Sequence, residues 1–281
     1  MIHIKKILLL GNTGKIGLAL DEIFNKDYKI IGKNSKDFDA EDLSGIRNII
    51  KETKPNIVIN TVAFMSVLPC QKNPEKAFRI NALFPRHLAE LSVKKDFLLI
   101  HFSTAAVFDN SKEEPYIESD PARPINVYGA TKYCGDCFVK SKGKRYYIFR
   151  LPIVFGKAIK KKQFVERMLE KVRNKETTLR IATDVIDTPS YSKDIARTVK
   201  EVIEDDLAFG LYHTANQGQA SLFELINEII KNLNIDVKVE KASYKDFDDC
   251  NEKNIKSALA SEKLKPLRSW KNALKEYCKE I

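Results

Sequence analysis

The chain has 281 residues, of which 43% are hydrophobic, and its 48 lysines and arginines outnumber its 38 acidic residues, giving a formal net charge of +10. This composition excludes a disordered chain, and no apolar run approaches the roughly 20 residues that span a bilayer, so we expect no membrane partner. The first apolar stretch is too short for a signal peptide. We therefore expect a cytoplasmic protein with reduced cysteines.

The basic residues are scattered along the chain, and the densest run covers residues 157–162. We interpret that run as a solvated loop or as a basic segment that attracts phosphate groups. Because no nucleic-acid-binding motif accompanies it, we expect no nucleic-acid partner. Cys134 and Cys137 form a C-x-x-C pair, but no second pair or histidine cluster follows, so no metal site is expected.

A short apolar run at residues 4–10 predicts a buried first strand, and a helical pattern begins after Gly17. Strand, glycine turn and helix in this order are typical of a dinucleotide site, because glycines let the backbone approach a pyrophosphate at the helix N-terminus. The spacing is G-x-x-G-x-x-G. The candidate cofactor residues of this turn are Gly11, Asn12, Thr13, Gly14, Lys15, Ile16 and Gly17.

Strands and helices alternate in the first half of the chain. Strands are predicted at residues 4–10, 28–32, 57–61, 97–102 and 146–151, with helices after Gly17 and around 44–52, 74–93 and 128–140. This alternation predicts an α/β fold with a doubly wound parallel sheet. We expect residues 1–151 to form the core of the cofactor domain.

The pattern changes after Leu151. Helices are predicted at residues 162–173, 192–204, 221–232 and 267–279, with a short strand at 179–182. We expect residues 152–281 to form mainly a smaller substrate-binding lobe, with segments that return to the cofactor domain. His101, His213 and Trp270 are interpreted as structural residues.

Tyr128 and Lys132 are four positions apart on a predicted helix, so their side chains share one face. A lysine ammonium beside a phenol favours the phenolate, which predicts a lowered tyrosine pKa and a role in proton transfer to a carbonyl or alcohol oxygen. An apolar strand ending in Ser103 and Thr104 precedes this helix.

The cofactor type is read from the end of the second strand. An acidic residue there holds the ribose 2′-hydroxyl of NAD, whereas a basic residue suits the 2′-phosphate of NADP. The chain reads Gly-Lys-Asn-Ser-Lys at residues 32–36, with no acid before Asp37. We therefore expect NADPH, with NADH as the alternative, and Lys33 or Lys36 as the phosphate contact.

Taken together, the glycine turn, the Ser103-Thr104 strand end and Y-x-x-x-K resemble the extended short-chain dehydrogenase/reductases, and more narrowly the dTDP-4-dehydrorhamnose reductase family. Further stretches similar to that family lie at residues 60–63, 73–75, 81–82, 150–152, 154–156, 188–194, 257–259 and 263–264. The resemblance covers nearly the whole chain and implies a Rossmann-like fold.

The resemblance also implies roles for individual residues. Tyr128 would protonate the substrate oxygen, Lys132 would tune Tyr128 and hold the nicotinamide ribose, and Thr104 would hydrogen-bond the substrate. It implies further cofactor contacts at Asp39, Thr61, Val62, Ala63, Ser103 and Pro152. It implies substrate contacts at Ser66, Ala105, Ala106 and Ser257.

One stretch departs from the family pattern. After Ser-Thr the family usually has Asp-Tyr-Val-Phe, whereas this chain has Ala-Ala-Val-Phe at residues 105–108. Ser-Thr-Ala-Ala-Val is also similar to UDP-sugar 4-epimerases, which hold NAD. The 4,6-dehydratases need an acidic pair at this point, so a dehydratase is not expected.

We expect NADPH-dependent reduction of a nucleotide-activated 4-keto sugar for surface polysaccharide or glycan biosynthesis. The alternatives are an NAD-dependent 4-epimerase and a dinucleotide-binding regulatory subunit, like that of methionine adenosyltransferase. The expected partners are a nucleotide-sugar substrate and, as an open alternative to a monomer, a second copy of the chain in a homodimer.

Overall fold

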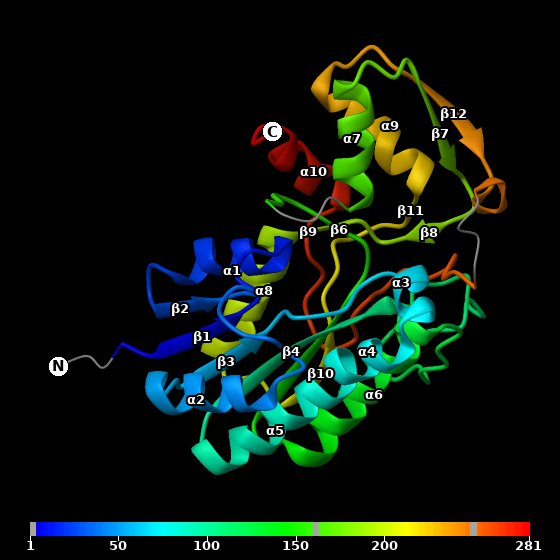
Figure 1. Cartoon of the computed structure of the whole chain (residues 1–281). Coiled ribbons are helices and arrows are strands. Elements are labelled where there is room, and N and C mark those ends of the chain that lie inside the picture. Colours follow the sequence, from blue (N-terminus) through cyan, green and yellow to red (C-terminus); the bar gives the residue numbers. More distant parts are fainter. Residues whose placement is uncertain (1–3, 160–162, 248–251) are drawn as a thin grey trace.

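A six-stranded parallel sheet forms the centre of the protein (Figure 1) in a computed structural model that describes residues 4–159, 163–247 and 252–281. The strand order is β2-β1-β3-β4-β5-β10. These strands are β1 (Lys6–Leu10), β2 (Lys29–Lys33), β3 (Ile57–Asn60), β4 (Leu98–Thr104), β5 (Tyr146–Leu151) and β10 (Gly210–His213). The predicted α/β class and parallel sheet are confirmed, and each of the five predicted strands is present.

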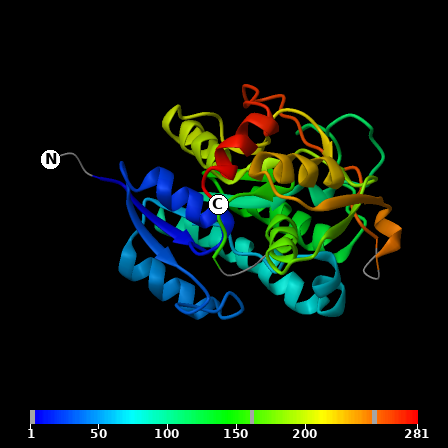
Figure 2. The same cartoon turned by 90° about the horizontal axis from the view of Figure 1, so that it is seen from above.

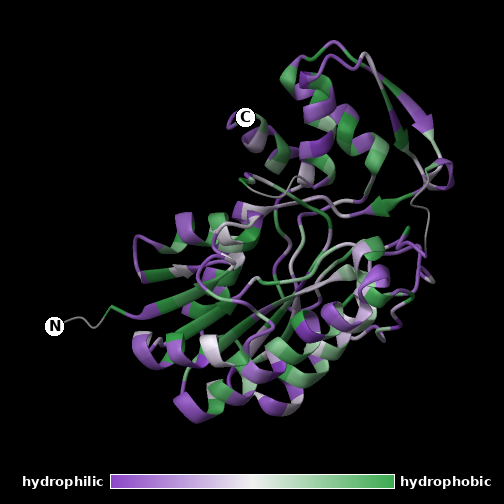
Figure 3. Cartoon of the chain, in the orientation of Figure 1, coloured by the Kyte–Doolittle hydropathy of each residue, from purple (hydrophilic) through white to green (hydrophobic). Residues whose placement is uncertain are grey.

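Helices cover both faces of the sheet because both faces of its strands are apolar. Ile7 and Leu9 of β1 pack toward α1 (Lys15–Phe24) and α8 (Ser192–Glu204), whereas Leu8 and Leu10 pack toward the opposite layer. That layer contains α2 (Leu43–Thr53), α5 (Phe84–Lys95) and α6 (Val127–Lys142). Figure 3 shows the apolar strands between helices whose outer surfaces are hydrophilic.

The helix predicted at residues 74–93 is present from Pro74 to Lys95, but it is not α-helical throughout. It divides into α4 (Pro74–Phe78), a π-helical turn (Arg79–Leu83) and α5, after a separate short helix α3 (Val67–Lys72). Pro85 has no N–H to donate to the carbonyl of Asn81, which removes one α-helical hydrogen bond at this point. The buried Asn81 side chain instead accepts from Phe64 N and donates to Phe64 O, both at 2.9 Å. The turn thereby fixes the loop that follows β3.

The second lobe stands above the carboxyl ends of the strands in Figure 1, and α10, red in Figures 1 and 2, packs beside α9. Its apolar core includes Phe155, Leu225 and Trp270, and Trp270 is buried as predicted. The lobe contains β6 (Val154–Phe155), α7 (Phe164–Arg173), β7 (Thr178–Ala182), β8 (Ile186–Asp187), β9 (Ser190–Tyr191), β11 (Ala220–Ser221), α9 (Leu222–Leu233), β12 (Lys238–Ala242) and α10 (Trp270–Cys278).

Short 3-10 turns at Ala105–Val107 and Tyr244–Asp246 complete the described elements. The predicted helix start at Lys162, the end of the basic run at residues 160–162, and Cys250 lie outside the described residues. Within the part of the chain that the structure describes, no helix is both long and apolar enough to cross a membrane.

Candidate active site

The candidate site lies at the carboxyl ends of β1 and β3, where the sheet order changes direction. From β1 the chain moves outward to β2 and then returns to β3 on the other side of β1. In open parallel α/β sheets, ligands bind in the crevice at such a switch point. The glycine turn that follows β1 therefore stands at the entrance to this crevice.

The glycine turn is close-packed at two of its three glycines. Gly11 has φ +87°, and a Cβ atom there would lie 2.4 Å from Thr61 Oγ1. A Cβ on Gly17 would lie 2.2 Å from Gly11 O, so the start of α1 can approach the turn only without a side chain. Gly14 is different, because its φ of −79° is ordinary and the atom nearest to an added Cβ would be Gly11 O, at 3.3 Å.

Helix α1 begins with an uncapped N-terminus. Its N-cap residue is Gly14, which supplies no side-chain hydrogen bond to the first turn. The first backbone N–H groups of an α-helix have no partner within the helix and carry the positive end of its dipole. This helix start is suited to an anion such as a pyrophosphate.

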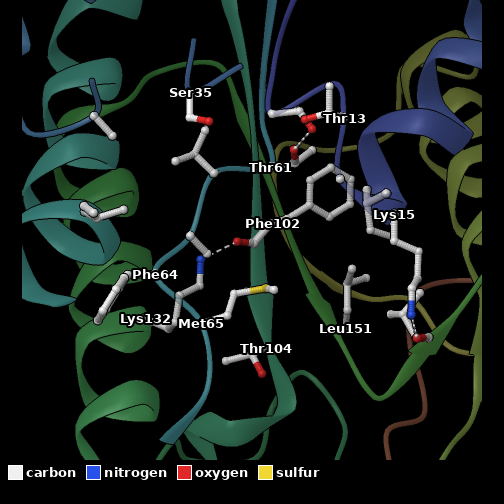
Figure 4. Close-up of a pocket in the computed structure, with 18 of the residues that line it drawn as sticks. Thr13, Lys15, Ser35, Thr61, Phe64, Met65, Phe102, Thr104, Lys132 and Leu151 are labelled. Atoms are coloured by element: carbon white, nitrogen blue, oxygen red, sulfur yellow. Dashed lines mark hydrogen bonds between the residues drawn. The ribbon is translucent and has the colours of Figure 1, made fainter. Parts of the chain in front are cut away.

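A cavity of about 770 Å³ extends from the glycine turn to the ends of β4 and β5 (Figure 4). Such a volume is within the range of small-molecule and cofactor sites. It brings together most of the residues singled out from the sequence, namely Gly11, Thr13, Gly14, Lys15, Ile16, Asp39, Thr61, Val62, Ala63, Ser103, Thr104, Tyr128, Lys132 and Pro152.

The remaining candidates do not line this cavity. Asn12 packs against Gly32, and Gly17 supports the turn from α1. Lys33 is half-buried, with its ammonium 3.8 Å from Asp37 Oδ1. The others are Lys36, Ser66, which has φ +80°, Ala105, Ala106 and Ser257, whose hydroxyl donates to Asp187 Oδ2 at 3.2 Å.

A buried hydroxyl in the cavity wall fits a polar ligand. Ser103 is 6% exposed, and its Oγ has no hydrogen-bond partner among the described residues. Buried polar atoms are almost always hydrogen-bonded, so an unpartnered hydroxyl at a cavity points to a ligand. Together with the glycine turn and the uncapped α1, this wall fits a dinucleotide.

Helix α6 carries the Tyr128–Lys132 pair and is held closely against the end of β4. Asn126 caps it by accepting a hydrogen bond from Gly129 N at 2.9 Å. A Cβ on Gly129 would lie 2.1 Å from Ala106 O, so a glycine is needed for this approach. The contact places Tyr128 and Lys132 in the wall that also contains Thr104.

The Lys132 ammonium is buried and donates to Phe102 O at 2.6 Å (Figure 4). Burial lowers the pKa of Lys132 to about 8, although the nearby Asp136 carboxylate opposes this shift. Burial also raises the pKa of Tyr128 to about 12, which hydrogen bonding with Thr104 only partly offsets. The predicted lowering of the Tyr128 pKa is therefore wrong for this arrangement, and the phenol is protonated at neutral pH.

Behind Lys132 lies a buried ionic cluster. Asp136 Oδ2 accepts from Arg150 Nε at 3.1 Å, and Asp136 Oδ1 is 3.9 Å from His101 Nε2. Burial, with the nearby Lys132 charge, holds the pKa of His101 well below its usual range, so this histidine is neutral. Its position in the interior confirms the structural interpretation of His101. His213 is likewise buried, with Nδ1 within 3.1 Å of two backbone carbonyls.

Sequence reasoning missed several cavity residues. Asn34 and Ser35 directly follow β2, so their positions in the chain already marked them as neighbours of the cofactor ribose. Met65 and Gln163 carry no such signal, because they meet in the cavity wall from segments far apart in the sequence.

The family model for the RmlD substrate binding domain matches residues 5–281. The chain is a member of the RmlD family. Membership confirms the resemblance to dTDP-4-dehydrorhamnose reductases, and it extends over the second lobe as well as the sheet.

Three relatives of this RmlD-family chain match along nearly their whole lengths. The spore coat polysaccharide biosynthesis protein SpsK of Bacillus subtilis is 29% identical over 98% of this chain and 97% of its own. A dTDP-4-dehydrorhamnose reductase of Clostridium acetobutylicum has a TM-score of 0.92 and 30% identity, covering 98% of this chain and 99% of its own. The Bacillus anthracis enzyme of that name, in complex with NADP, has a TM-score of 0.93 and 27% identity, covering 99% of this chain and 100% of its own.

Proposed function

We propose that this chain reduces the C4 carbonyl of a nucleotide-activated 4-keto sugar, with NADPH as the reductant. Relatives named as dTDP-4-dehydrorhamnose reductases, one of them in complex with NADP, support the substrate class and the cofactor. The observation that carries the proposal is the position of Tyr128, which lies with Thr104 and Lys132 in the wall of a cavity that begins at a dinucleotide-type glycine turn.

The residues around the cavity have separate roles in the reaction. When bound, NADPH supplies the hydride that reduces C4. Tyr128 gives its phenolic proton to the oxygen that becomes the alcohol, and Thr104 holds that oxygen by a hydrogen bond. The Lys132 ammonium stabilises the phenolate left on Tyr128, which then regains a proton from solvent. The Tyr128 phenol is protonated at neutral pH, so it has a proton to give as the alkoxide forms.

The 2′-phosphate of NADPH is assigned to the end of β2. Lys33 lies there, and Asn34 and Ser35 line the cavity beside it. Asp39 is assigned to the adenine side of the same wall. Ala105 and Ala106, which stand where the family usually has Asp-Tyr, leave the choice of sugar to other residues of the cavity.

The test is a panel of dTDP-, UDP- and GDP-linked 4-keto sugars with NADPH and NADH, followed by NMR of the products. The expected result is consumption of one reduced nicotinamide for each alcohol formed. Interconversion of an ordinary UDP-hexose with the cofactor unchanged would instead establish the epimerase. Dinucleotide binding without turnover of any panel member would favour the regulatory subunit.

A role in surface polysaccharide synthesis is proposed from SpsK, whose name places that relative in spore coat polysaccharide biosynthesis. The cytoplasmic location and the homodimer stay predictions. Fractionation and size-exclusion chromatography with light scattering test them directly.

A further inference from the structure

Lys15 lines the cavity, yet its ammonium is held by the second lobe. The Nζ atom donates to Val154 O at 2.8 Å and lies 2.9 Å from Glu166 Oε1 (Figure 4 shows the first of these contacts). The side chains of Lys15 and Glu166 are only 5% and 13% exposed. Since Lys15 begins α1 and Glu166 belongs to α7, this ion pair joins the glycine turn to the second lobe.

The other oxygen of Glu166 organises the cavity wall. Glu166 Oε2 accepts a hydrogen bond from Gln163 N at 2.9 Å and completes the capping box of α7. Gln163 lines the cavity, and its Nε2 lies 3.8 Å from the sulfur of Met65, which lines the cavity from the segment after β3. One carboxylate therefore links Lys15 to the start of α7 and to Gln163 in the cavity wall.

A lysine is an unfavourable residue at this position. The start of α1 carries the positive end of the helix dipole, which repels a cation. Burial lowers the pKa of Lys15, and only the Glu166 carboxylate opposes that shift. The ammonium is thus stable here because of an anion that comes from another lobe.

We propose that Lys15 and Glu166 are a positioning pair that couples dinucleotide binding at α1 to the ordering of α7 in the cavity wall. This inference rests on the dinucleotide site proposed above. A pyrophosphate at the start of α1 is attracted by Lys15 and repelled by Glu166. Dinucleotide binding favours the charged form of Lys15. The ammonium, shared between the pyrophosphate and Glu166, then holds Glu166 and the first turn of α7 in place.

The two replacements then have different effects on cofactor affinity. Replacing Lys15 leaves an unpaired carboxylate beside the pyrophosphate, whereas replacing Glu166 leaves an unpaired ammonium there. Lys15→Met should weaken NADPH binding by about tenfold or more, the scale of loss when one partner of a buried charge pair is removed. Glu166→Gln should keep NADPH affinity within about threefold, because the amide oxygen still caps α7 and no repulsive charge remains. The double variant should recover the affinity that Lys15→Met loses.

The experiment combines calorimetric titration with NADPH and hydrogen–deuterium exchange of residues 164–173. In the wild type, saturating NADPH should slow exchange in α7. In Glu166→Gln this slowing should be lost although NADPH still binds. Glu280→Gln is the matched control. It removes the ion pair between Glu280 and Lys193, which are 2.7 Å apart. That pair also joins the helix layer of the sheet to the second lobe, but neither residue lines the cavity. That variant should behave like the wild type.

Two results would overturn the coupling. One is wild-type exchange in α7 that does not respond to bound NADPH, and the other is an equal response in Glu166→Gln and the wild type. An affinity of the double variant no better than that of Lys15→Met would also contradict the charge argument. Failure of NADPH to bind the wild type would instead contradict the dinucleotide site itself, so the two failures are distinguishable.

Discussion

The ammonium of Lys132 donates its hydrogen bond to the backbone carbonyl of Phe102, 2.6 Å away, and so ties α6 to the end of β4. This contact holds a buried cation one helical turn from Tyr128, at the level where the strand end opens into the cavity. The pair is therefore built into the junction of helix and sheet, and variants at each residue separate its chemical role from its structural one.

Tyr128→Phe keeps the ring and removes the hydroxyl. We expect turnover of a confirmed 4-keto substrate to fall by about 10²–10⁴, the usual contribution of a general acid, while NADPH binding is retained. Stopped-flow oxidation of NADPH measures the rate, and calorimetry measures the affinity. Near wild-type turnover in this variant would remove Tyr128 from the mechanism.

The pH dependence should reflect Lys132 rather than Tyr128. Because the pKa of Lys132 is lowered to about 8, its charge is present below that pH and is lost as the pH rises through it. Tyr128, with a pKa of about 12, stays protonated over the same interval. We expect kcat/KM to fall above pH 8 in the wild type.

Lys132→Arg is the control for that profile. Its guanidinium stays charged, so whatever rate remains should not fall in the same interval. A profile that is flat to pH 10 in the wild type, or an alkaline loss that persists in Lys132→Arg, would contradict the assignment.

Gly14 and Gly17 should fail in different ways. Gly14→Val keeps an ordinary backbone conformation, because φ at this position is −79°, and an added Cβ would meet only Gly11 O, in a tight contact of 3.3 Å. It should fold normally and lose NADPH affinity, because the added side chain obstructs the helix start. Gly17→Ala should instead destabilise the fold by about 1–3 kcal/mol or more, because its Cβ would stand 2.2 Å from Gly11 O. Thermal unfolding and calorimetry separate the two; tight NADPH binding by Gly14→Val would argue against the site.

Lys33→Ala tests the choice between NADPH and NADH. A charged hydrogen bond contributes about 1.5–3 kcal/mol, so NADPH affinity should fall by about 10- to 150-fold while NADH affinity changes little. Adding Lys36→Ala should deepen the same selective loss. Lys29→Ala, at the exposed start of β2, is the control. Equal losses for both cofactors would leave Lys33 as surface charge paired with Asp37.

Local patterns predicted the sheet and the glycine turn because those patterns are local in origin. The apolar run of β1, the turn at Gly11 and the pair at Tyr128 and Lys132 are each contained in a few consecutive residues. The π-helical turn was missed, although Pro85 marked the place where an α-helical hydrogen bond is absent.

The pKa values and ion pairs of the site could not be predicted from local sequence patterns. The spacing of Tyr128 and Lys132 predicted a cation that lowers the phenol pKa, but burial raises that pKa, and the ammonium donates to Phe102 O. The contact of Lys15 with Glu166 depends on how two lobes meet, which no periodicity within either segment reports.

The position of β10 in the sheet has a consequence for synthesis on the ribosome. This strand pairs with β5 but lies about 60 residues later in the sequence, after the first segments of the second lobe, and α8, which covers Ile7 and Leu9, precedes it only shortly. A nascent chain that has emerged only as far as Leu151 therefore exposes β5 as a free edge beside a bare apolar face. Such an intermediate is prone to pair with another strand, so a fragment cut at this point should aggregate, and the emerging chain needs protection until His213 has left the exit tunnel.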